Sequence, residues 1–263
     1  MANAGTEPVP SVKDLASSEP SVRRSCFKTL ITHLNERDPS SHLTSTQCLQ
    51  IWRGLYVALY MHDSKSAISV QNLTAELAGM LNTMASKDAD VQSSSDQPYS
   101  WLDTWTTAFW ETICREWSSI DQWRMNKVLL LVRFFLRDLF NLTLMSACND
   151  ASATMPESKD MISGQIHILE SWPLSPRARK VPDGLRLHVL DVWVDELTSQ
   201  INAVQKELSH SDDSNTETIE NVCLNVAKSF MVPLEKVSRE ALSKGVKIRA
   251  REALKVFQEQ FPS

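Results

Sequence analysis

The stretch Trp101-Leu-Asp-Thr-Trp-Thr-Thr-Ala-Phe-Trp-Glu-Thr-Ile-Cys-Arg-Glu-Trp-Ser-Ser-Ile-Asp-Gln-Trp123 holds five of the eight tryptophans of this 263-residue chain. At ~100° per residue, its apolar side chains cover about half of a helical cylinder. A stripe of roughly 100° suffices for a helix that rests on one neighbour. The stretch therefore predicts a helix that packs against two neighbours.

Two tryptophans lie at the opposite edges of this apolar arc, Trp101 and Trp110. Packing within the chain accounts for most of the indoles, because each removes ~150–250 Å² from water when it is buried. The alternative is that one edge of the arc binds another molecule. Trp101 and Trp110 are therefore the aromatic side chains that we predict to face a partner.

Glu116 interrupts the apolar arc, because its angular position falls between those of Trp105 and Phe109. A carboxylate buried at such a position needs a partner. We expect Arg124 or Lys127, at the start of the next helix, to pair with it. The alternative is that Glu116 accepts hydrogen bonds from the first-turn amides of that helix.

The low glycine content and the apolar residues at three-to-four spacing predict an all-helical chain. Successive long helices joined by loops favour antiparallel pairs stacked as a HEAT-like α-solenoid, although no clean sequence repeat is visible. The expected helices include Ser66–Ser86, Tyr99–Trp117, Asp121–Ser146, Asp183–Leu208, Thr216–Met231, Leu234–Ser243 and Val246–Phe261.

The domain organisation follows from composition. Residues 1–19 are rich in Ser, Pro and Glu and are predicted to be disordered, and residues 20–263 to form one helical domain. Three polar loop insertions are expected near residues 87–98, 147–158 and 209–215. Gly54 and Ala58, one turn apart, leave a smooth edge where another backbone can approach.

The net charge of the chain restricts which parts of its surface can bind RNA. The net charge is −5 and the pI is about 5.7, which excludes a basic coat over the whole surface. Two local clusters remain, one in the proline-rich connector Trp172–Pro182 and one near the C-terminal end. Solvated surface is the other interpretation of both clusters. The candidates for contact with RNA or a partner are Arg177, Arg179, Lys180, Lys247, Arg249 and Arg251.

Signatures of catalysis are missing from the sequence. It has no glycine-rich phosphate loop, no nucleophile elbow and no Cys/His nucleophile pattern, and its five cysteines are widely spaced. His188, Asp191 and Asp195 share one helix face, but a solvated polar face is the favoured interpretation over a metal site. We therefore expect no enzymatic activity, no cofactor and no small-molecule substrate.

A membrane segment is not expected either. The most apolar run, 128–140, is interrupted by Arg133, Arg137 and Asp138 and is too short to cross a bilayer.

Three blocks of the sequence resemble the nucleolar ribosomal RNA processing protein one family. They are Leu49-Gln-Ile-Trp-Arg-Gly-Leu-Tyr-Val-Ala-Leu-Tyr-Met-His-Asp63, Phe109-Trp-Glu-Thr-Ile-Cys-Arg-Glu-Trp-Ser-Ser-Ile-Asp-Gln-Trp-Arg-Met-Asn-Lys127 and Pro182-Asp-Gly-Leu-Arg-Leu-His-Val-Leu-Asp-Val-Trp-Val-Asp-Glu-Leu197. The resemblance implies a non-enzymatic assembly factor of the large (60S) ribosomal subunit, needed for precursor rRNA processing in the nucleolus.

The resemblance also implies partners. They are other large-subunit assembly factors and ribosomal proteins within pre-60S particles, together with precursor rRNA, which the local basic clusters would contact. The alternative is a helical-repeat adaptor that binds peptides and has no role with RNA.

Overall fold

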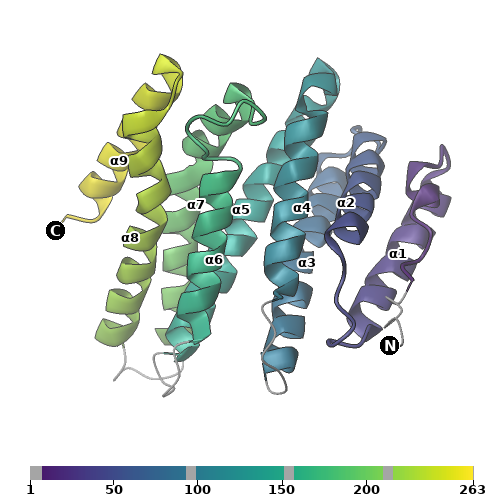
Figure 1. Cartoon of the computed structure of the whole chain (residues 1–263), viewed down its shortest axis with the longest axis horizontal. Coiled ribbons are helices and arrows are strands. Elements are labelled where there is room, and N and C mark those ends of the chain that lie inside the picture. The colour runs from purple at the N-terminus through teal and green to yellow at the C-terminus, as the bar shows by residue number, and fades with distance from the viewer. Residues whose placement is uncertain (1–7, 93–98, 151–156, 210–215, 263) are drawn as a thin grey trace, which may run out of the picture. The chain divides into compact units, whose positions relative to one another are not determined.

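The computed structural model describes residues 8–92, 99–150, 157–209 and 216–262, and within these ranges it contains nine α-helices and no strand (Figure 1). The prediction of an all-α fold is therefore confirmed. The helices are α1 (Pro20–Glu36), α2 (Ser45–Tyr60), α3 (Ala67–Gln92), α4 (Trp101–Glu116), α5 (Gln122–Asp150), α6 (Glu157–Ser171), α7 (Asp183–Ser209), α8 (Thr216–Glu240) and α9 (Lys244–Gln260). Two short 3-10 helices, η1 (Lys13–Ala16) and η2 (Trp117–Ser119), accompany them.

The chain forms two compact units, and the single helical domain over residues 20–263 stays a prediction. The first unit is Met1–Leu131 and the second is Val132–Ser263. The boundary falls inside α5, so no linker and no change of composition marks it. A boundary within one continuous helix leaves no signal for a sequence pattern to reveal.

The tryptophan-rich helix α4 packs against α2 and α3, which confirms the prediction of two neighbours. The indole N–H of Trp52 on α2 donates to the carbonyl of Trp105 at 3.1 Å. The Trp52 ring lies 4.9 Å from the rings of both Trp105 and Phe109. These rings are almost completely buried, and they form the centre of the first unit.

Helix α3 continues through the start of a predicted polar insertion, because its polar side chains find partners. The Lys87 ammonium donates to the carbonyls of Asn35 and Arg37 at 2.7 and 2.6 Å. The Asp88 carboxylate accepts the backbone amide of Trp101 at 2.7 Å, at the positive N-terminal end of α4.

The other two predicted insertions also begin later than expected. Helices α5 and α7 extend to Asp150 and Ser209. The remaining parts of the three insertions, 93–98, 151–156 and 210–215, lie outside the described residues.

The N-terminal segment is ordered where disorder was expected. Leu15 of η1 is fully buried. Its side chain lies so close to Gly54 that a Cβ atom added at Gly54 would be only 2.8 Å from the Leu15 Cδ1 atom. The backbone carbonyl of Val12 approaches the same glycine. The prediction of a close approach at Gly54 is confirmed, and the prediction of disorder is wrong for Lys13–Ala16. Residues 1–7 lie outside the described part.

Glu116 pairs with a residue that the sequence did not suggest. Its carboxylate lies 3.8 Å from the Nε atom of Arg53 on α2. The expected cations are engaged elsewhere, Arg124 with Asp121 and Lys127 with carbonyls of α2. Asp121 also accepts the backbone amide of Arg124 at 3.0 Å. The prediction is wrong because Asp121 directly precedes α5 and takes the role that we assigned to Glu116.

Two buried cations bind the carbonyl groups at the end of α2. The Lys127 ammonium of α5 donates to the carbonyls of Tyr60 and His62, both at 2.8 Å. The Arg23 guanidinium of α1 donates to the carbonyl of Met61 at 3.3 Å. Burial, and then the neighbouring Arg124 guanidinium, lowers the pKa of Lys127. Three helices of the first unit thus meet at one helix end.

The second unit has its own aromatic centre. The ring of Trp193 on α7 lies 5.0 Å from Phe140 of α5 and 6.3 Å from Phe230 of α8. Helix α9 runs in the same direction as α7, since Arg249 meets Asp191 and, further along both helices, Gln260 accepts a hydrogen bond from the Thr198 hydroxyl.

Helix α8 is continuous where the sequence predicted a break before Leu234. Pro233 lies inside α8. Phe230, Leu234 and Val237 are fully buried on either side of it. A proline removes one backbone hydrogen bond and strains the helix, and burial of these apolar side chains offsets that loss.

Replacing Lys127 tests the role of the cations at the end of α2. Lys127→Met should lower the free energy of unfolding by ~2–4 kcal/mol, because two partly buried carbonyls lose their donor. Urea denaturation would measure the change. Lys28→Met, at an exposed position of α1, is the control and should leave the midpoint nearly unchanged. Equal midpoints for the two variants would contradict the role given to Lys127.

Candidate nucleic-acid interface

The connector between α6 and α7 is held by one buried arginine. The Arg186 side chain is only 5% exposed, in the first turns of α7. Its guanidinium donates to three connector carbonyls, those of Ser175 at 2.8 Å, Ala178 at 2.7 Å and Val181 at 2.6 Å. The connector is not helical, as its three prolines predicted. Arg186 therefore fixes the path of a segment that has no regular structure of its own.

The three basic connector residues differ in how they are engaged. All three are exposed. Arg177 lies 3.9 Å from the Glu240 carboxylate at the end of α8. The Lys180 ammonium lies 3.4 Å from the ring centroid of Trp172, a cation–π contact. Arg179 forms no ion pair with any described residue.

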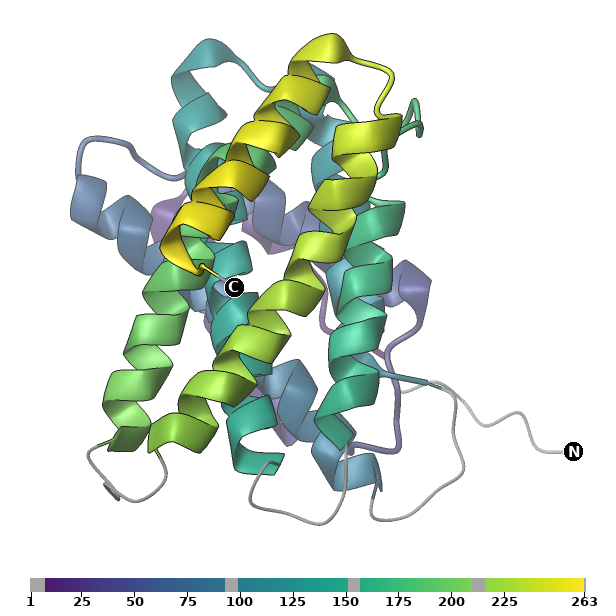
Figure 2. The same cartoon turned by 90° about the vertical axis from the view of Figure 1, so that its left-hand side faces the viewer.

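The connector contacts the turn between α8 and α9. The backbone amide of Leu242 donates to the carbonyl of Pro176 at 3.3 Å, and Figure 2 shows this turn beside the segment that joins α6 to α7. Lys244 begins α9 two residues later. The fold therefore brings the two basic clusters, which are far apart in the sequence, to one corner of the second unit.

Helix α9 divides its basic residues between two sides. Val246, Ala250, Ala253 and Phe257 form its buried face. Lys244, Lys247 and Arg251 follow at spacings of three and four, which places them along one outer edge. Arg249 lies on a different side, where its Nε atom is 3.0 Å from Asp191 and 3.6 Å from Glu252.

Five cations at this corner have no carboxylate partner among the residues that the structure describes. We call them the basic surface: Arg179, Lys180, Lys244, Lys247 and Arg251. Other basic residues of the C-terminal region are neutralised, Lys236 by Glu170 at 3.2 Å and Arg239 by Glu235 at 3.4 Å. Of the six basic residues that the sequence singled out, Arg177 and Arg249 are the two that acidic side chains engage.

The two tryptophans that we expected to face a partner are buried. Trp101 is 2% exposed and its indole N–H donates to the Pro39 carbonyl at 2.9 Å. Trp110 is fully buried, with its ring 4.8 Å from Phe109. The prediction is wrong because the angular position of a residue on its helix does not show which other segments cover it. Other segments of the chain cover both edges of the apolar arc of α4. Trp123, at 79% exposure, is a tryptophan that faces solvent.

The polar face of α7 is engaged in an ion pair rather than gathered into a metal site. Asp191 pairs with Arg249, and Asp195 is exposed. Within the described ranges, no group of three His, Cys, Asp or Glu side chains is placed to hold a metal ion. Nor is any helix in those ranges long and apolar enough to cross a membrane.

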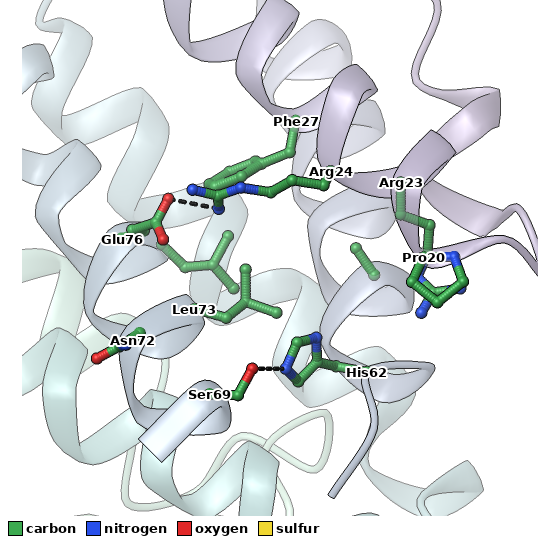
Figure 3. A pocket seen from close by; sticks show the side chains of 11 residues that line it. Pro20, Arg23, Arg24, Phe27, His62, Ser69, Asn72, Leu73 and Glu76 are labelled. Atoms are coloured by element: carbon green, nitrogen blue, oxygen red, sulfur yellow. Dashed lines mark hydrogen bonds and ion pairs between the residues drawn. The ribbon is translucent and has the colours of Figure 1, made fainter. Parts of the chain in front are cut away.

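A cavity of about 360 Å³ lies in the first unit, between α1, the end of α2 and α3 (Figure 3). Polar side chains at its edge bond to one another, Arg24 to Glu76 at 2.6 Å and His62 to Ser69 at 2.9 Å. Leu73 lies between these pairs. Burial lowers the pKa of His62, and the Lys127 ammonium lowers it further. These pairs leave few polar groups to orient a small molecule.

Removing the Arg186 guanidinium tests whether it fixes the connector. Arg186→Met should reduce the free energy of unfolding by ~2–5 kcal/mol and speed amide hydrogen exchange across 172–182, because three buried or partly buried carbonyls lose their donor. Arg177→Met, at an exposed position of the same segment, is the matched control. Unchanged exchange in the Arg186→Met connector would show that the prolines alone determine its path.

Comparison with known proteins places the chain in a family. Residues 6–261 match the family of the nucleolar protein Nop52. The chain is 30% identical over 217 residues to "Ribosomal RNA processing protein 1 homolog B" of Mus musculus, which covers 82% of this chain and 26% of the mouse protein. The corresponding human protein is 29% identical over 217 residues, with 82% and 25% covered.

A nematode relative extends this similarity beyond mammals. The chain is 22% identical over 195 residues to "Ribosomal RNA processing protein 1 homolog" of Caenorhabditis elegans, which covers 74% of this chain and 43% of that protein. The chain thus spans about a quarter of the two mammalian relatives and less than half of the nematode one. Because the family match covers residues 6–261, which include all the described helices, the chain belongs to the Nop52, or ribosomal RNA processing protein 1, family of nucleolar proteins.

Proposed function

We propose that this chain is a non-enzymatic assembly factor of the large (60S) ribosomal subunit, which acts in the nucleolus and is required for precursor rRNA processing. The observation that carries the proposal is the family match over residues 6–261. The names of the relatives refer to ribosomal RNA processing, and the family description is that of a nucleolar protein.

The proposed mechanism is binding without chemistry. A scaffold that binds one conformation of a precursor particle stabilises that conformation by mass action, by ~2.7 kcal/mol when its free concentration is about 100 times Kd. Nucleases supplied by other proteins then act on a substrate held in one arrangement. Rigid helical units suit this role, because a surface that is already ordered loses little conformational entropy when it binds.

The partners that we propose are other large-subunit assembly factors, ribosomal proteins and precursor rRNA within pre-60S particles. We also propose that the helices stack as a HEAT-like α-solenoid, an architecture that offers extended binding surfaces. Within the first unit, α2 and α4 run in the same direction and pack together, which agrees with such stacking. Within the second unit, α7 and α9 do the same.

Sedimentation of the tagged, full-length protein from nuclear extracts tests the proposal. We expect it to co-sediment with particles that contain precursor rRNA of the large subunit, and RNase treatment should release it or shift the particles. Depletion of the protein should cause large-subunit precursors to accumulate while small-subunit precursors remain normal. Free sedimentation without precursor rRNA would overturn the proposal and favour the peptide-binding adaptor.

A further inference from the structure

We infer that the basic surface binds the phosphate backbone of double-helical RNA, without reading the base sequence. The inference deepens the proposed function. It rests on that function only for the identity of the RNA that the protein binds in the cell. Binding itself is a property of the purified chain and is measured separately.

The arrangement of charge points to a polyanion. The chain carries 27 Lys and Arg against 32 Asp and Glu, so acidic groups are available to neutralise its cations. They do so at Arg177, Arg249 and Lys236. The five cations of the basic surface are left without such partners among the described residues, although they are gathered at one corner where they repel one another. A line of phosphates relieves that repulsion and releases counterions.

The backbone that carries the basic surface is held in place by hydrogen bonds and by helix α9. Arg179 and Lys180 are flanked by the carbonyls of Ala178 and Val181, which Arg186 binds. Lys180 is held against Trp172. Lys244, Lys247 and Arg251 extend from this corner over about 10 Å of helix. A preorganised charge array loses less freedom when it binds than mobile lysines do.

Double-helical RNA fits this surface better than a single strand does. Proteins that bind single strands stack the bases on exposed aromatic rings. The aromatic ring at this corner is Trp172, which is half-buried and has the Lys180 ammonium 3.4 Å from its ring centroid. The exposed apolar side chains beside the cations are aliphatic, Leu242 at 72% and Ile248 at 43% exposure. In an RNA duplex the bases are stacked internally and the protein meets phosphates and 2′-hydroxyls.

Fluorescence anisotropy with the purified full chain tests the inference. The probes are two 20-base-pair RNA duplexes of unrelated sequence and a 20-nucleotide unstructured single strand. We expect equal Kd for the two duplexes and weaker binding of the single strand. Five phosphate contacts predict that log Kd rises with log salt with a slope of about 4.5 between 50 and 200 mM KCl.

Two double variants locate the contact. Lys247→Gln with Arg251→Gln, and Arg179→Gln with Lys180→Gln, should each weaken duplex binding about tenfold or more and reduce the salt slope by about 2. Arg249→Gln is the control, because it removes one positive charge from the same helix on a different side, where acidic side chains engage it. Thermal melting verifies that every variant is folded.

Several outcomes would overturn the inference: tighter binding of the single strand, unequal Kd for the two duplexes, or an equal loss of affinity in the Arg249→Gln control. The proposed function fails differently. If the purified chain binds duplexes as expected but the cellular protein sediments free of precursor rRNA, the function is wrong and the inference stands. If the purified unsubstituted chain does not bind duplexes while the cellular protein co-sediments with precursor rRNA, the inference is wrong and the function stands.

Discussion

Long cations that bind backbone carbonyls hold this fold together at its helix ends. An α-helix leaves its last four carbonyls without intrahelical donors, and many helices satisfy some of them with a glycine in the left-handed conformation. Among the described residues no backbone adopts a positive φ angle, with glycine or without. Lysine and arginine supply the donors instead. Lys87 does so at the end of α1, and Lys127 and Arg23 do so at the end of α2.

This choice of donor links helix ends to other helices. A glycine cap is local, whereas Lys127 belongs to α5 and Arg23 to α1, so both depend on tertiary packing. Arg186 has the same role in the connector. There the prolines provide no amide donors, and one guanidinium donates to three carbonyls. Loss of such a cation leaves several buried acceptors unsatisfied at once, which costs more than loss of one exposed ion pair.

The sequence predicted helices and their buried faces well, because apolar periodicity is a local property of the chain. It located α4 and predicted that this helix packs against two neighbours, and it identified the close approach at Gly54. It failed where the answer depends on which segment covers a face. Trp101 is covered by the segment that contains Pro39, and Glu116 meets Arg53. Both contacts join residues more than 60 positions apart, and no periodicity within one helix encodes them.

The candidate site shows the same division between local and distant information. Composition identified both basic clusters, but only the contact between Leu242 and Pro176 shows that they meet. Arg249 and Arg251 are equivalent members of one basic cluster in the sequence, yet two residues of helix separate their directions by about 160°. One therefore reaches Asp191 while the other belongs to the basic surface. In an acidic chain, a cation is available to a ligand only when the fold keeps carboxylates away from it, and that selection requires the three-dimensional structure.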